Sequence, residues 1–455
     1  MRSDIFGQPC SLGSAQAVQD WNAAMLAFLA HGAATPTHLG RVLAAEPGFA
    51  LGQATRGLFM LLLGRSEVRP DAQAAFDAAR DGVAQGDATA RERLYVAALG
   101  DWLDGFPSLS VDRLESVLRD HPGDTLAMKL VQAILFILGD PSAMRASVER
   151  VLPAYAPDHP GRGYLLGCHA FALEETGAYD RAEIAGRQAL WLAPDDAWGL
   201  HAVAHVHDMT ANARAGLDWL SGREKAWAHC NNFRYHVWWH KALMHLDLGQ
   251  VDRVLALYDR QIRCDRTDDF RDISNATSLL MRLELDGVPV GDRWEELSEL
   301  CAARTDDGAL IFADLHYLLA LTGDRRPDAA ARMVRRIARD AQGNSDMGSR
   351  MADPGTAAAR GLEAFGDGRH AEAFRHLAQA RGGMQRAGGS HAQRDVFERI
   401  TIDAGIRAGY LDRAELFLSE RQARRAGRED SYAAARRALI AQARGQSRAL
   451  STPAQ

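Results

Sequence analysis

The apolar and polar positions of this chain form a recurring phrase, whereas alternating runs of β-branched residues are almost absent. The phrase consists of a helix, a turn of small residues, and a shorter helix that often ends near a proline. Its clearest copy reads GYLLGCHAFALEETGAYDRAEIAGRQALWLAPDD, with Gly177 at the turn and Pro194 at the end. The pattern predicts an all-α chain of repeated helical hairpins.

The spacing inside that copy matches a tetratricopeptide unit at Gly177, Tyr179, Ala182, Ala189 and Pro194. Further copies start near Ala197 and Tyr235, and weaker ones are phased by turn glycines roughly 32 to 46 residues apart, at Gly32, Gly64, Gly105, Gly139, Gly287, Gly323, Gly368 and Gly409. One hairpin alone buries too little core to be stable. We therefore expect about eleven hairpins to stack into a tetratricopeptide-like solenoid, a superhelix with a concave groove.

No long linker rich in proline and serine interrupts the repeats, so we expect one continuous solenoid over residues 16–440. It follows an N-terminal arm, residues 1–15, and precedes a flexible C-terminal tail, residues 441–455. The glycine-rich segments 340–355 and 380–390 are predicted loops.

Composition and charge exclude several classes of protein. A content of 47% hydrophobic and 25% charged residues is that of a soluble globular chain, and a net charge of -6 argues against nucleic acid as a partner. The most apolar run, residues 130–138, is too short to span a bilayer, so no membrane partner is expected. The N-terminus lacks the apolar core of a signal peptide, and five cysteines form no C-x-x-C pair. These features predict a cytoplasmic protein.

Histidine and tryptophan concentrate in the middle of the chain. Nine of the sixteen histidines lie between His159 and His245, and six of the nine tryptophans lie between Trp191 and Trp239. First helices of tetratricopeptide hairpins line the concave groove. The groove positions of three consecutive units hold Tyr164, Phe171, Glu174, Glu175, His201, His205, Asp208 and His236.

Two histidine pairs have the i, i+4 spacing that places both side chains on one helix face: His201 with His205, and His236 with His240. We expect the pairs on adjacent first helices, facing a common enclosed cavity. Such pairs suit a late transition metal, although no H-E-x-x-H motif is present. Three interpretations stay open: hydrogen-bonded wall residues, a metal-free small-molecule site, and a metal site at these four histidines. The metal site, which would hold a divalent transition metal, is not the favoured interpretation. The sequence identifies no cofactor.

Two further groups come from the C-terminal third. Asp314 and His316 lie together at the start of a hairpin, and His391 and Asp395 are spaced i, i+4 after a glycine-rich loop. Ser390 is an expected N-cap, which would place Gln393 and Arg394 in a first turn whose N–H groups could face a bound anion. A Ser390-His391-Asp395 triad is rejected, because adjacent helical residues point in different directions.

The tryptophans have mainly a packing interpretation. Trp191, Trp198, Trp219 and Trp227 are expected to wedge hairpins together at helix ends. Trp238 and Trp239 are consecutive and face different sides, and Trp239 is the candidate that reaches the groove.

Several of these phrases resemble one known family. GYLLGCHAFALEETGAYDRAE, DDAWGLHAVAHVHDM, HVWWHKAL, LYDRQI and GGSHAQRDVFERI are similar, in order and from about Ala15 to Arg421, to the tetratricopeptide repeat protein 38 family. The resemblance implies a soluble helical-repeat protein of bacteria and animals, and it implies no particular reaction.

The favoured functional interpretation is a pocket lined by histidine, carboxylate and aromatic groups that binds a small molecule. Its candidate acid–base residues are His201, His205, His236, His240, His391 and Asp395, and its candidate ligand-binding residues are Tyr164, Glu174, Glu175, Asp208, Trp239, Asp314, His316, Gln393 and Arg394. Many groups that titrate near neutrality favour hydrolase- or lyase-type acid–base chemistry, which the sequence does not establish. The alternative is a peptide- or protein-binding scaffold without catalysis. Homo-oligomerisation stays open.

Overall fold

The computed structural model describes residues 2–451, with side chains as far as residue 446. In this range two short antiparallel strands, β1 Arg2–Ser3 and β2 Pro9–Cys10, precede twenty-five α-helices. The all-α prediction is confirmed. The composition explains it, because alanine, leucine, arginine and glutamate favour helix.

Twenty-two of the described helices pair into eleven consecutive hairpins. The hairpins are α1 Ala15–Leu29 with α2 Thr35–Ala45, α3 Ala50–Leu61 with α4 Arg69–Ala84, α5 Ala90–Leu103 with α6 Pro107–Asp120, α7 Thr125–Leu138 with α8 Pro141–Val151, α9 Arg162–Glu175 with α10 Tyr179–Leu192, α11 Ala197–Met209 with α12 Ala213–Leu220, α14 Phe233–Asp247 with α15 Val251–Leu257, α16 Phe270–Leu285 with α17 Arg293–Ala302, α18 Ile311–Gly323 with α19 Pro327–Asp340, α21 Thr356–Gly366 with α22 His370–Ala380, and α23 His391–Arg407 with α24 Leu411–Arg424. Three helices lie outside this scheme: α13 Lys225–Ala228, α20 Asp346–Arg350 and α25 Ser431–Ser451.

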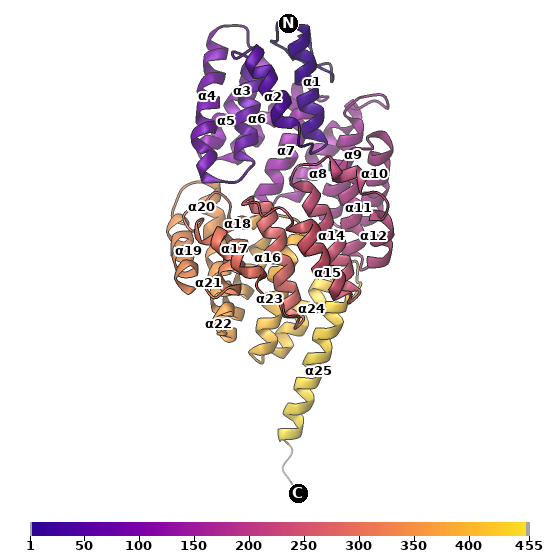
Figure 1. The fold of residues 1–455 in the computed structure, drawn as a ribbon, viewed down its shortest axis with the longest axis vertical. Coiled ribbons are helices and arrows are strands. Elements are labelled where there is room, and N and C mark those ends of the chain that lie inside the picture. The colour runs from indigo at the N-terminus through magenta and orange to yellow at the C-terminus, as the bar shows by residue number, and fades with distance from the viewer. Residues whose placement is uncertain (1, 452–455) are drawn as a thin grey trace.

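The hairpins stack into a superhelix that turns back on itself. Figure 1 shows the first hairpins, α1 to α6, above the later helices α16 to α22. The turn between α5 and α6 meets the start of α20. Turns of the earlier hairpins rest on residues of the second half, and we call this contact the seam. It involves the turns near residues 64, 105, 139, 176, 210 and 248, whose partners lie between residues 268 and 431.

Backbone and charged contacts hold the seam along its length. The amide of Ser66 donates to Asp307 Oδ1 at 2.6 Å, and the amide of Asp346 donates to the carbonyl of Gly105 at 3.1 Å. The side chain of Gln385 donates to the carbonyl of Gly139 at 3.3 Å. An open solenoid lacks such contacts, because each repeat touches only its neighbours. The seam closes this superhelix around its concave face.

The ends of the chain differ from a simple arm and tail. Phe6, Cys10 and Leu12 of the first fifteen residues are buried against the first hairpins, so this segment packs as part of the fold. The expected tail, residues 441–455, begins inside α25, which continues to Ser451. Residues 452–455 of that prediction lie outside the described range.

The two segments predicted as loops are largely helical. Residues 340–355 contain α20 and a π-helical turn, Met351–Gly355, and residues 380–390 contain the 3₁₀ turn Arg381–Ala387. Glycine content misled the prediction, because these glycines serve close packing within short turns. None of the helices between residues 2 and 451 combines the length and hydropathy of a bilayer-spanning segment.

Candidate functional site

The concave face of the superhelix surrounds a cavity of about 1000 Å³. First helices of the hairpins supply most of its wall, as expected for a tetratricopeptide-like array, and the loop before α23 closes one side. Much of the wall is apolar, and the contributing side chains are Phe28, Leu39, Leu43, Phe59, Met60, Leu62, Leu63, Phe136, Ile137, Phe171, Trp198, Phe233, Leu310 and Phe312. Ala33, Pro36 and Gly40 also line the cavity and are exposed, so the cavity opens beside α2.

Lys129, on α7, is a buried cation in this apolar wall. Its side chain is 5% exposed, and its Nζ lies 3.8 Å from Cys168 Sγ and 5.0 Å from the centre of the Trp198 ring. Within the described chain no carboxylate forms an ion pair with it. The nearby carboxyl of Asp196 is no strong counter-charge, because burial raises its pKa to about 7, although Lys129 and the Gly199 amide act in the opposite direction.

Other charged groups at the cavity are balanced or exposed. Arg271 is held by Asp269 through two hydrogen bonds of 2.8 and 2.5 Å, and Arg234 pairs with Asp265 at 3.1 Å. Arg56 lines the cavity from α3 and is exposed. The cavity therefore carries an excess of positive charge, and Lys129 is its buried member.

The two histidine pairs meet at the inner end of the cavity. His201 Nε2 lies 3.0 Å from His236 Nε2, which lies 3.2 Å from His240 Nε2. The ring of His205 is centred 4.3 Å from those of both His201 and His240. One nitrogen from each of the four rings lies within 4.8 Å of the other three. His201 and His236 line the cavity, whereas His205 and His240 lie fully buried behind them.

Helix packing places these rings. The i, i+4 spacing puts each pair on one face of α11 or α14, and the two helices lie side by side. The helix α9 approaches α11 closely, because a Cβ on Gly199 would lie 3.3 Å from the Cα of Gly167. That approach carries Glu174, at the end of α9, to His205, whose Nδ1 lies 3.4 Å from Glu174 Oε2.

Burial keeps most of the cluster neutral. It lowers the pKa of His201 and of His240, and it lowers that of His236 to about 3 despite the hydrogen bond with Asn275. His205 differs: burial would lower its pKa, but Glu174 outweighs burial and raises it. Several ring nitrogens have no hydrogen-bond partner in the described structure, namely His201 Nδ1, His205 Nε2 and His240 Nδ1, whereas His205 Nδ1 has only the 3.4 Å contact with Glu174. Each buried donor left unpaired costs about 1–3 kcal/mol.

Glu174 and Glu175 have separate partners. Burial raises the pKa of Glu174, against the effect of His205. Burial also opposes ionisation of Glu175, but His391 and Arg394 outweigh it and lower the pKa of Glu175. Glu175 Oε1 accepts the backbone N–H of His391 at 2.6 Å, and its Oε2 accepts from Arg394 at 3.1 Å.

The first turn of α23 is therefore not free for a ligand. Ser390 is the N-cap, as predicted, and it also forms a capping box with Gln393. The anion that this N-terminus receives is Glu175 of α9, and Arg394 pairs with the same carboxylate. Sequence reasoning anticipated an anion here, but the seam supplies it from the chain itself. Ser390 and Gln393 of this group line the cavity, whereas Arg394 and Glu175 are not part of its wall.

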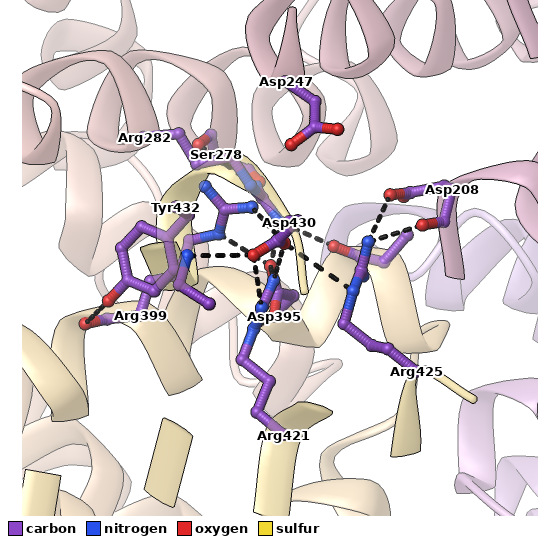
Figure 2. Close-up of polar contacts among 12 residues, drawn as sticks. Asp208, Asp247, Ser278, Arg282, Asp395, Arg399, Arg421, Arg425, Asp430 and Tyr432 are labelled. Carbon is purple, nitrogen blue, oxygen red and sulfur yellow. Dashed lines mark hydrogen bonds and ion pairs between the residues drawn. The ribbon is translucent and has the colours of Figure 1, made fainter. Parts of the chain in front are cut away.

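Asp395 and Asp208 lie in an ion network outside the cavity (Figure 2). Asp395 Oδ1 accepts from Arg421 Nε at 2.6 Å, and the same guanidinium donates to Asp430 Oδ2 at 2.6 Å. Arg425 pairs with Asp208 Oδ1 at 3.2 Å across the seam. These carboxylates connect α11, α23, α24 and the start of α25, so their geometry is that of structural ion pairs.

Three other predicted site residues also have structural partners. Asp314 forms a two-pronged, fully buried ion pair with Arg336, at 2.9 and 2.6 Å. His316 Nδ1 lies 2.8 Å from the carbonyl of Phe312, and burial lowers the pKa of His316 to about 4. Tyr164 donates to Asp195 Oδ1 at 2.9 Å. None of these three is part of the described cavity wall.

The tryptophans take several roles. Trp219 and Trp227 are buried in packing, as predicted, whereas Trp191 is 83% exposed on α10. Trp198 lines the cavity, a role that its position at a helix start concealed. Trp239 is fully buried and stacks on His236 at 5.2 Å between ring centres, behind the cavity wall.

Sequence reasoning missed the first half of the cavity. The wall formed by α1, α2, α3 and α7 includes Phe28, Phe59, Phe136 and Lys129. One signal was present: Lys129 and Gln132 are one helical turn apart in an otherwise apolar helix. Beyond the groove positions considered in the sequence, the full wall also contains basic and amide side chains: Lys129, Arg56, Arg234, Asn231 and Asn232.

Known proteins resemble this chain only weakly. No family model matches the sequence. A solved structure of a human IFIT1 dimer with PPP-AAAA is similar at 14% identity and a TM-score of 0.36, over 82% of this chain and 86% of that one. Yeast Tom70 aligns at 12% identity and a TM-score of 0.36, over 95% and 89%. The TPR domain of P58(IPK) aligns at 9% identity and a TM-score of 0.21, over 69% and 98%. The hairpin series of this chain, rather than these weak likenesses, defines its helical-repeat architecture.

Proposed function

We propose that this protein binds a small amphipathic acid, with the apolar body of the ligand in the cavity and its carboxylate on Lys129. The observation that carries the proposal is a buried cation in an apolar wall that forms no ion pair with any carboxylate of the described residues. Removing an ion from water costs several kcal/mol unless an opposite charge compensates. A ligand carboxylate would provide that charge.

The size and character of the cavity support a compact ligand. Small-molecule sites are concave, mostly apolar, and typically 300–1000 Å³ in volume, with a few polar groups that fix orientation. This cavity lies at the upper end of that range and combines aromatic walls with Lys129, His201 and Gln393. An extended peptide would need a groove open along its length, whereas the seam closes this superhelix.

Three finer assignments accompany this proposal. The chain is a member of the tetratricopeptide repeat protein 38 family, on the phrases quoted above. It works in the cytoplasm without nucleic acid, which its five unpaired cysteines and its net charge favour. The hydrolase- or lyase-type reaction stays a prediction, and binding is the function proposed here.

Replacing Lys129 by methionine should abolish the preference for an acid over the matched alcohol. The probes are a dansyl-labelled long-chain fatty acid and the corresponding dansyl alcohol, titrated by fluorescence. We expect the wild-type protein to bind the acid about 10- to 100-fold more tightly, since a hydrogen bond to a charged group contributes about 1.5–3 kcal/mol. In Lys129→Met the two affinities should become equal.

The chain offers a matched control because it contains only three lysines. Lys225 is exposed on α13, and Lys225→Met should bind both probes like the wild-type protein. Equal affinity of the wild-type protein for acid and alcohol would contradict the proposal, and so would an unchanged preference in Lys129→Met.

Lys129→Met should also stabilise the ligand-free protein. The substitution replaces an unpaired buried charge with an apolar side chain of similar length, so the free energy of unfolding should rise by about 1–2 kcal/mol. Urea denaturation of the two proteins without ligand measures the difference. A large loss of stability instead would show that Lys129 has a structural partner.

A peptide- or protein-binding scaffold without catalysis is the second candidate function. Helical-hairpin arrays present extended binding surfaces. An exposed apolar pair on α10, Ile184 and Trp191, gives this chain such a surface outside the cavity. Under this function, neither dansyl probe would bind in the cavity, and Lys129→Met would leave partner binding unchanged.

A further inference from the structure

We propose that His201, His205, His236 and His240 bind one late first-row divalent cation, with Zn²⁺ as its common representative. This site goes beyond the proposed acid-binding function, because its four ligands belong to the chain and require no cavity ligand. The convergence of one nitrogen from each ring within 4.8 Å of the others is the central observation.

The spacing of the nitrogens suits a tetrahedral ion. With Zn–N bonds of 2.0–2.1 Å, neighbouring ligand nitrogens of a tetrahedron lie about 3.3 Å apart. The Nε2 atoms of His201 and His240 lie 3.0 and 3.2 Å from His236 Nε2. These two distances need to widen only slightly around an ion, and the wider pairs, which lie within 4.8 Å, would have to close inward.

Hydrogen bonds within the cluster account for this arrangement less well. His236 Nδ1 lies 2.9 Å from Asn275 Oδ1, so that nitrogen carries the proton and Nε2 keeps a single lone pair. Two other Nε2 atoms compete for this lone pair. A cation instead accepts one lone pair from each ring at the same time.

The surroundings offer oxygen partners for the ring nitrogens that would not bind the ion. Histidine ligands commonly use their other ring nitrogen to contact a carboxylate or carbonyl oxygen. Here His205 Nδ1 faces Glu174 Oε2 at 3.4 Å, and His236 Nδ1 faces the Asn275 amide oxygen. Glu174 is buried and has no partner in the described structure besides His205, so a cation bound by the four rings would favour its ionised carboxylate.

The ligand chemistry selects the class of ion. Four imidazole nitrogens favour Zn²⁺, Ni²⁺ or Cu²⁺ over Mg²⁺ and Ca²⁺, which prefer oxygen ligands. A metal ion can reach the four histidines from solvent, because His201 and His236 line the cavity that opens beside α2.

The test uses the full chain after removal of metal with a chelator. Equilibrium dialysis against Zn²⁺ should give one ion per chain, and Co²⁺ should produce the intense visible absorption of tetrahedral coordination. His240→Gln should lower the affinity by more than about 100-fold, and Glu174→Gln by about 10- to 100-fold, because Glu174 orients the His205 ring rather than binding the ion. Circular dichroism establishes that each variant is folded.

The matched control is His245→Ala. This histidine is also buried on α14, but its Nδ1 contacts Gln250 Oε1 at 2.6 Å, away from the cluster. The His245→Ala variant should bind Zn²⁺ like the wild-type protein. Absence of stoichiometric Zn²⁺ in the wild-type protein, a weak octahedral Co²⁺ spectrum, or unchanged affinity in His240→Gln would overturn the proposal. These measurements contain no fatty acid, so their failure leaves the binding proposal for Lys129 to its own test.

Discussion

Replacing Arg421 by methionine should lower the free energy of unfolding by about 3 kcal/mol, because it leaves two buried carboxylates short of a partner. Arg421 holds Asp395 and Asp430 together, and all three side chains are nearly inaccessible to solvent. Arg399 also contacts Asp395 at 2.7 Å and provides partial compensation. Chemical denaturation of the variant and the wild-type protein measures the loss.

The same network should make stability depend on acid. Burial alone would raise the pKa of Asp395 and of Asp430, but the surrounding guanidinium groups outweigh it and lower both pKa values. The stabilisation is therefore complete above the unfolded-state pKa of aspartate, about 3.9, and is lost as the pH falls through the lower folded-state values. Arg421→Met should lose less stability on acidification than the wild-type protein.

An exposed arginine serves as the control for this experiment. Arg369 pairs with Asp367 and Glu372 at the surface, and such pairs contribute little. Arg369→Met should unfold like the wild-type protein. Similar losses in Arg369→Met and Arg421→Met would show that burial of the Arg421 network adds nothing.

Alanine at position 139 should destabilise the protein by about 3 kcal/mol, through backbone strain and through a clash at the seam. Gly139 ends α7 with a φ of 69°, a conformation that glycine tolerates best. A Cβ at this position would lie 1.9 Å from the carbonyl oxygen of Gln385. The backbone of the second half would have to move away.

Gly249→Ala separates the two causes. Gly249 also ends a first helix with a φ of 69°, but a Cβ there would meet no atom within 4 Å. It should cost only the strain, about 1 kcal/mol. Thermal unfolding of both variants decides between strain alone and strain with a clash. Equal losses would mean that the seam yields without cost at Gly139.

Local patterns predicted what local geometry determines. The i, i+4 spacing of His201 with His205 and of His236 with His240 places both pairs correctly, since helix periodicity alone decides which side chains share a face. The N-cap at Ser390 was predictable for the same reason. The repeated hairpin pattern was sufficient to predict the all-α fold class.

Long-range contacts explain what the sequence could not show. Asp314 looked like a ligand residue because its partner, Arg336, lies on the next helix and carries no recognisable signal. The anion at α23 is Glu175, which is 216 residues away in the chain. Lys129 was overlooked because its surroundings come from helices on both sides of the cavity. Periodicity does not encode how a superhelix closes.

Closure has a consequence for how the chain is made. The seam joins Ser66 to Asp307 and Gly139 to Gln385, partners that are 241 and 246 residues apart. At synthesis rates of 5–20 residues per second, the ribosome needs about 12 to 50 seconds to add the missing partners. During that interval the aromatic wall of α1, α3 and α7 has nothing opposite it. The nascent first half therefore exposes its apolar concave face, the kind of surface that chaperones recognise. The seam can form, and cover that face, only near the end of translation.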